Sequence, residues 1–204
     1  MKATINKHSS IKIVSNKTLY FDPFLINDES HDADIIFITH DHYDHFSIED
    51  IKKVEKEDTV YVIPENMYNL LGGENVVILR PFEKTQVEGY EVVTVPSYNV
   101  TKHFHPKDKQ NLGYIVTIEG KKVYVAGDTD MNDDNKNVKA DIVFVPIGGH
   151  YTMDYKEAAL LVNSIKPETA IPTHYGTNNI GSIEDAEKFK NLVNKSIKVN
   201  ILIE

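Results

Sequence analysis

The sequence predicts an α/β sandwich in which helices cover β-sheets, and two observations carry this prediction. Short apolar runs of the β type recur along the whole chain, and three helix start signals lie between them. The 204 residues contain no linker rich in proline and glycine and no repeat. We therefore expect one domain that spans residues 1–204.

The expected strands are short stretches in which Ile, Val, Tyr and Phe predominate, because these side chains pack well on a pleated surface. They are residues 11–14, 18–21, 35–38, 59–63, 76–79, 90–95, 114–118, 123–126, 142–145, 170–171 and 199–203.

Each expected helix begins at a residue whose side chain accepts hydrogen bonds from the first free backbone amides: Ser47, Asp154 and Ser182. Apolar residues then follow at helical spacing and form the expected buried faces. These faces are Ile48, Ile51 and Val54; Ala158, Leu161, Val162 and Ile165; and Ala186, Phe189 and Val193.

The composition limits the ligands that the chain can bind. A net charge of -9 argues against a nucleic-acid partner, since phosphate backbones are bound by clustered Lys and Arg. Arg80 is the single arginine among 22 basic residues, so a bidentate arginine clamp on a phosphate is nearly excluded. With no cysteine, neither a disulfide nor a thiolate ligand exists, and a metal must be held by His, Asp, Glu or other oxygen and amide donors.

No segment indicates export or insertion into a membrane. Residues 1–13 alternate between polar and apolar types, without the apolar centre of a signal peptide. No apolar run approaches the length of a membrane span. We expect a cytoplasmic protein with a small-molecule substrate and no membrane partner, and the sequence leaves open whether it forms a homo-oligomer.

Four of the expected strands run directly into a side chain that can act as a ligand. These side chains are His40, Asp128, His150 and His174. Rigid strands that each deliver such a group to one edge are how a preorganised site is built.

The densest cluster is His40-Asp41-His42-Tyr43-Asp44-His45, which places three imidazoles and a carboxylate within six residues. In an extended or turning segment, His40 and His42 face the same way and share one ion, while Asp44 and His45 reach a second. We therefore predict two ions about 3.5–4 Å apart. The alternative, a polar loop with solvated histidines, fits poorly with so dense a cluster directly after an apolar strand.

Three segments together resemble the metallo-β-lactamase superfamily in order and spacing: the HxHxDH cluster at 40–45, Gly127-Asp128-Thr129-Asp130, and Pro172-Thr173-His174-Tyr175-Gly176. The resemblance covers the whole chain. It is strongest to compact metal-dependent hydrolases related to L-ascorbate-6-phosphate lactonase, and more distant to N-acyl phosphatidylethanolamine phospholipase D. It implies a four-layer αββα sandwich with the site at one edge of the two sheets.

The resemblance also implies a ligand set. The first ion would be bound by His40 and His42, the second by Asp44, His45 and His174, and Asp128 would bridge them. Zinc is the expected ion at both positions, with manganese as the alternative.

One further ligand is missing from its family position, where a Pro-x-x-His segment reads Pro96-Ser97-Tyr98-Asn99. An amide oxygen is a weaker donor than imidazole. We expect His105 to complete the ligand set of the first ion, because Pro106 restricts the backbone of His105 and lowers the entropy that is lost on ligation. His103 and Asn99 stay open as alternatives.

The implied reaction uses no protein nucleophile. Two cations lower the pKa of a shared water to near neutrality, and the hydroxide attacks a carbonyl or phosphorus centre. Asp44 and Asp128 are the expected catalytic residues, with Asp44 orienting the hydroxide. The expected substrate is a small anionic ester, lactone or phosphodiester. The alternatives are a phosphodiesterase or nuclease of the same superfamily, or a protein that binds metal without turnover.

Other polar residues are expected around the ions. Asp22 and Thr39 are candidates for fixing imidazole tautomers, although Asp22 before a proline is equally typical of a turn. His8 is expected to line the site, Asn99 to contact substrate or a water near the metals, and His150 to contact substrate.

The stretch Asp128-x-Asp130-x-Asn132 resembles the start of a calcium loop. Asp133 stands where such a loop needs glycine, and Lys139 where it needs glutamate, so this interpretation fails. We expect the acidic residues up to Asp134 to form a solvated loop.

Overall fold

The computed structural model describes residues 1–177 and 180–203, and its centre is a pair of β-sheets. The six-stranded sheet has the order β1-β2-β3-β4-β5-β6, and the seven-stranded sheet has the order β13-β12-β11-β10-β9-β8-β7. The strands of the first are β1 (Lys2–Ile5), β2 (Ile11–Val14), β3 (Thr18–Phe21), β4 (Ala33–Phe37), β5 (Glu55–Pro64) and β6 (Val76–Leu79). The strands of the second are β7 (Lys84–Val87), β8 (Tyr90–Pro96), β9 (Leu112–Ile118), β10 (Lys121–Val125), β11 (Ile142–Pro146), β12 (Thr169–Thr173) and β13 (Lys198–Val199).

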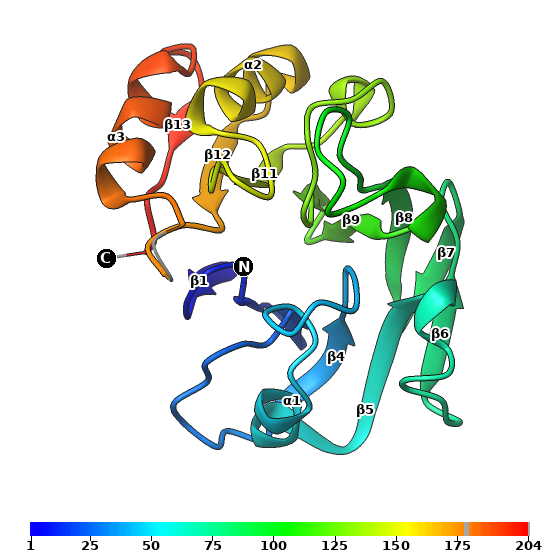
Figure 1. The fold of residues 1–204 in the computed structure, drawn as a ribbon. Coiled ribbons are helices and arrows are strands. Elements are labelled where there is room, and N and C mark those ends of the chain that lie inside the picture. The colour runs from blue at the N-terminus through cyan, green and yellow to red at the C-terminus, as the bar shows by residue number, and fades with distance from the viewer. Residues whose placement is uncertain (178–179, 204) are drawn as a thin grey trace.

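Helices cover the outer sides of both sheets. The helix α1 (Ile48–Val54) packs on the six-stranded sheet, where Ile51 and Val54 join a separate apolar cluster with Ile36 and Ile63. The helices α2 (Tyr155–Ile165) and α3 (Ile183–Leu192) lie together on the opposite side of the molecule (Figure 1). Short 3₁₀ turns occur at Glu65–Met67, Lys107–Lys109 and Asn135–Asn137. The four-layer αββα sandwich is thus confirmed.

All three predicted helix starts are confirmed. The side chains of Ser47, Asp154 and Ser182 accept hydrogen bonds from backbone N–H groups in the first turns of α1, α2 and α3. One predicted inward residue is wrong: Ile48 is 43% exposed. It occupies the first position of a helix of only seven residues, and the buried residues of this helix begin at Asp50.

The strands that the sequence missed or misjudged are edge strands. β1 and β7 were not predicted, and the last strand is confined to Lys198–Val199 instead of residues 199–203. An edge strand is paired on one side only, and here it carries polar residues such as Lys2, Lys84 and Gln86. Its apolar pattern is therefore too weak to identify it from the sequence.

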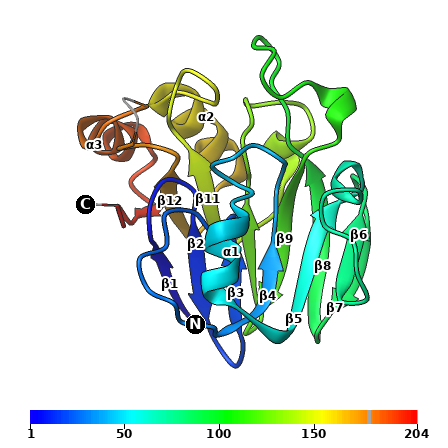
Figure 2. The ribbon, with the colours of Figure 1, turned by 60° about the horizontal axis from the view of Figure 1, so that its bottom comes forward.

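The two sheets are joined at the edge that carries the candidate site. The hydroxyl of Tyr114 in β9 donates to the Ile38 carbonyl just after β4 (2.7 Å), and the Leu112 amide donates to the Thr39 carbonyl (3.0 Å). β10, β11 and β12 are parallel, so their carboxyl ends meet at one edge. The segment between β8 and β9 projects there as well (Figure 2).

In the part of the chain that the structure describes, no helix combines the length and apolar character needed to cross a membrane.

Candidate metal centre

The HxHxDH segment turns back on itself directly after β4. The amides of His45 and Phe46 both donate to the His42 carbonyl, at 3.0 and 2.8 Å. This turn buries the rings of His40 and His45 completely and places their centroids 4.1 Å apart. A short segment thus directs several ligand atoms to one place.

The structure brings the predicted ligands into three overlapping groups. Within each group, the candidate ligand atoms all lie within 4.8 Å of one another. The groups are His40, His42 and His105; His40, His45 and Asp128; and His8, Asp44, His45 and His174. The division resembles the predicted two-ion arrangement, with His8 in addition.

Asp128 lies at the centre of these groups. Its carboxylate oxygens are 3.2 Å from His45 Nε2, 2.9 Å from His174 Nε2 and 3.5 Å from His105 Nε2. The residue follows β10 and is 2% exposed. It therefore contacts imidazoles of both predicted ion sites, as a bridging carboxylate must.

Asp22 and Thr39 fix two of the imidazoles through contacts to their Nδ1 atoms. Asp22 Oδ2 is 2.7 Å from His45 Nδ1, and both carboxylate oxygens accept from Thr39. Because the Thr39 hydroxyl donates to Asp22, it can only accept from His40 Nδ1, 3.0 Å away. With Nδ1 of His40 and of His45 held by these groups, Nε2 of each ring is the atom left to bind an ion.

Asn99 fixes a third imidazole. Its amide nitrogen donates to Asp130 Oδ1 (3.1 Å) and to the Tyr151 carbonyl (2.9 Å), two groups that can only accept. The amide oxygen must therefore face His105, whose backbone N–H and Nδ1 lie 2.9 and 3.1 Å away. Nδ1 of His105 then carries the proton, and Nε2 is free to bind an ion.

The alternatives to His105 are placed elsewhere. His103 is exposed and belongs to none of the three ligand groups. The polar atoms of Asn99 all contact protein groups, so Asn99 supports His105 and does not line the cavity.

His8 lies beside Asp44. Its Nε2 is 3.1 Å from Asp44 Oδ2, and its Nδ1 is 2.7 Å from the Thr177 hydroxyl. His8, Asp22 and His174 all have left-handed backbone angles, with φ values of 55°, 47° and 58°. Such angles are unfavourable for residues with a Cβ and often occur at functional sites.

Burial and charge give the imidazoles different proton affinities. Burial lowers the pKa of His40 well below its usual value and that of His105 to about 4. Burial also disfavours the charged form of His45, but the carboxylates of Asp128 and Asp22 raise its pKa well above the usual value. The imidazoles of His174 and His45 overcome the effect of burial on Asp128 and lower the pKa of its carboxyl. A cation between these groups would replace the proton of His45.

The donor atoms fit a bound metal. Among the described residues, several buried side-chain atoms here make no hydrogen bond of normal geometry, although some of them contact one another as ion pairs: His40 Nε2, His45 Nε2, Asp128 Oδ1, and both ring nitrogens of His174. Buried polar atoms that lack a well-directed hydrogen bond are costly, and natural proteins contain few of them. Nitrogen and carboxylate donors without sulfur suit zinc or manganese.

A cavity of about 630 Å³ opens over the cluster. Ligand candidates form one part of its lining, and aromatic and aliphatic side chains form the rest. The lining residues are His42, Tyr43, Asp44, Phe104, His105, Asp128, His150, Tyr151, His174 and Ile180. His150 is exposed at this cavity and belongs to none of the three ligand groups found among the described residues.

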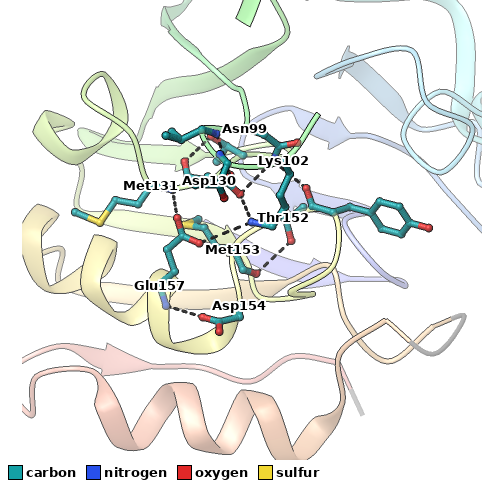
Figure 3. A network of polar contacts seen from close by, with 12 residues as sticks. Asn99, Lys102, Asp130, Met131, Thr152, Met153, Asp154 and Glu157 are labelled. Atoms are coloured by element: carbon teal, nitrogen blue, oxygen red, sulfur yellow. Dashed lines mark hydrogen bonds and ion pairs between the residues drawn. The ribbon is translucent and has the colours of Figure 1, made fainter. Parts of the chain in front are cut away.

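The expected solvated loop after Asp128 is wrong in part: Asp133 is exposed, but Asp130 is 1% exposed. Its carboxylate accepts from Lys102 Nζ (2.5 Å), from Asn99 and from the Val100 amide (2.9 Å), while Glu157 of α2 accepts from the Met131 amide (Figure 3). The network joins three loops that are far apart in sequence, and no local pattern indicated it.

Comparisons with known proteins agree with this geometry. A family model described as the beta-lactamase superfamily domain matches residues 4–174. A UPF0173 metal-dependent hydrolase of Thermococcus onnurineus is 33% identical, over 96% of this chain and 93% of the relative, and one from Pyrococcus abyssi is equally similar over the same shares.

Solved structures show the same fold. A protein of Parabacteroides distasonis, described as a metal-dependent hydrolase, has a TM-score of 0.84 and 31% identity, with 99% of this chain and 93% of that chain covered. The metallo hydrolase Igni18 of Ignicoccus hospitalis has a TM-score of 0.79 at 23% identity, with 98% and 93% covered. The finer resemblance to L-ascorbate-6-phosphate lactonase stays a prediction. The chain belongs to the beta-lactamase superfamily, among its metal-dependent hydrolases.

Proposed function

We propose that this protein uses two divalent ions to hydrolyse a small anionic ester, lactone or phosphodiester. One observation carries the proposal: three overlapping groups of ligand atoms surround the buried carboxylate of Asp128, which lines one cavity. Among the described residues, several of these atoms are buried without a hydrogen bond of normal geometry.

The ligand groups suggest how two ions would be divided. His40, His42 and His105 would hold the first, and Asp44, His45 and His174 the second, with Asp128 between them. Zinc is the ion proposed, with manganese as the alternative. When bound, the ions would supply Lewis acidity, which lowers the pKa of a coordinated water and polarises the substrate oxygen.

Asp44 would orient the attacking water. Burial alone raises the pKa of its carboxyl, but the hydrogen bond from His8 and the charge of His45 lower it to about 2. A carboxylate of so low a pKa accepts a hydrogen bond from water but is too weak a base to keep the proton. His8 would hold this carboxylate in place, and His150 would contact substrate from the open side of the cavity.

The test combines metal content with turnover. Protein reconstituted with zinc or manganese should bind two ions per chain and hydrolyse at least one member of a panel of carboxylic esters, lactones and phosphodiesters. Asp128→Ala and His174→Ala should abolish turnover while circular dichroism stays unchanged, and His31→Ala, at an exposed histidine, should behave like the parent.

Three outcomes would contradict the proposal. A metal content of zero after reconstitution would remove its basis. Two bound ions without turnover of any substrate would favour a metal-binding protein. Loss of folding in both variants would indicate that Asp128 and His174 are structural.

A further inference from the structure

The cavity has a chemically distinct side that the ligand cluster does not use. Phe104, His150 and Tyr151 all line it. Their rings contact one another: the centroid distances are 4.6 Å for Phe104–Tyr151, 4.5 Å for His150–Tyr151 and 5.5 Å for Phe104–His150. We call these three residues the aromatic wall. It adjoins the ligands directly, because Phe104 precedes His105 in the chain.

The lining carries no permanently charged cation. None of the described residues around the cavity is a lysine or an arginine, and Tyr43 and Ile180 add further apolar surface. The nearby Lys102 is committed to the buried Asp130, at 2.5 Å. A negative charge on the substrate would therefore be met at the ions, and the rest of the substrate would meet no second positive group.

Buried polar contacts hold the aromatic wall in place. The Tyr151 carbonyl accepts from Asn99, which also holds His105. Asn99 is itself anchored to Asp130 (Figure 3). The segment after Tyr151 is tied down by the Met153 amide, which donates to the Thr129 carbonyl at 3.1 Å.

The segment before the wall is equally constrained. A Cβ on Gly148 would lie 2.6 Å from the His174 carbonyl oxygen, so this loop packs directly against a ligand residue. A surface that is preformed in this way loses little entropy when a ligand packs on it.

We infer that the aromatic wall is a subsite for a flat apolar group, such as an aryl ring, attached to the reacting centre of the substrate. Aromatic side chains offer large apolar area and favourable edge-to-face contacts to such a group. The inference rests on the proposed function and narrows its substrate class to compounds with one charged or polar reacting group and an uncharged aryl arm.

Two hydroxamates provide a test that does not require turnover. Acetohydroxamate and phenylacetohydroxamate share a metal-binding head and differ in the phenyl arm. With zinc-loaded protein, calorimetry should show that the phenyl compound binds roughly tenfold to hundredfold more tightly. Phe104→Ala should remove most of this preference, Phe104→Leu should keep part of it, and Phe82→Ala, at an exposed phenylalanine outside the cavity, should keep all of it.

Hydrolysis separates this inference from the proposed function. For γ-phenyl- and γ-methyl-butyrolactone, Phe104→Ala should raise KM for the phenyl compound roughly tenfold more than it raises KM for the methyl compound. Equal hydroxamate affinities in the parent, or equal losses for both hydroxamates in Phe104→Ala, would overturn the subsite. A phenyl preference without turnover of either lactone would support the subsite and count against the proposed reaction.

Discussion

Asn99 occupies the position where the family pattern has a histidine, and its amide contacts a candidate ligand, His105, instead of belonging to a ligand group itself. Because Asp130 and the Tyr151 carbonyl accept from its nitrogen, its oxygen is available to His105 alone. The substitution thus keeps the residue in the site but changes its task from ligation to orientation of a neighbouring ring.

Replacing Asn99 should weaken the first ion site in particular. We expect Asn99→Ala to lower zinc affinity there about 10- to 100-fold, the usual effect of losing a group that orients a ligand. Chelator competition would measure this, and nitrogen NMR of the His105 ring should show loss of the single tautomer protonated at Nδ1. Asn137→Ala, at an exposed asparagine, serves as the control. An unchanged affinity and tautomer in Asn99→Ala would contradict the assignment.

Among the secondary-structure elements, α2 connects the site to the outer layer. The side chain of its cap, Asp154, accepts hydrogen bonds from the Lys156 and Glu157 amides. The side chain of Glu157 accepts a hydrogen bond from the Met131 amide, in the loop that follows Asp128. The start of this helix is therefore fixed both by its own cap and by the loops of the site.

Removing this cap should destabilise the fold modestly. Asp154→Ala is expected to lower the free energy of unfolding by about 1 kcal/mol, the usual value for a lost N-cap. Urea denaturation would measure it, with Asp28→Ala in an exposed loop as the comparison. A midpoint equal to that of the parent would show that the loops alone define the start of α2.

The elements also show which features a sequence can predict. Caps such as Ser47 and Ser182 are local signals, and they identified all three helices. The HxHxDH cluster is equally local, since a single turn assembles it. Edge strands have weak apolar patterns, and the burial of Asp130 depends on loops that meet only in the folded chain. The candidate ligands were therefore predicted from the dense cluster, from polar residues at strand ends and from the family resemblance, whereas the buried network around Asp130, which depends on contacts between distant loops, was missed.

At the scale of the whole molecule, the ligands come from both sheets. His40 and His42 follow β4 of the six-stranded sheet, whereas His105 and Asp128 follow β8 and β10 of the seven-stranded sheet. Binding of ions should therefore stabilise the sandwich as a unit, since the native chain assembles the complete sites and the unfolded chain does not.

Removing metal should lower the melting temperature. At free zinc about a hundredfold above Kd, each site adds about 2.7 kcal/mol to the stability of the native state. For a domain of this size, that corresponds to roughly 5–10 °C in Tm for each site, and to roughly 10–20 °C when both ions are removed. Calorimetry with zinc and with EDTA would measure the difference, and Asp128→Ala should show a much smaller one. Identical melting curves for the parent in both conditions would contradict a structural contribution of the ions.

The division of ligands between the sheets also governs how slowly an ion would leave. Each proposed site combines residues after β4 with two residues from the other sheet, His105 and Asp128 in one and His174 and Asp128 in the other. Exchange of a single imidazole would leave an ion still attached on both sides. Escape would require the two sheet edges to separate, a motion opposed by the contacts of Tyr114 and Leu112. The rate of release would then be set by this opening of the protein. The metal-bound protein would therefore lose its ions slowly, even at chelator concentrations at which the metal-free protein is the more stable form.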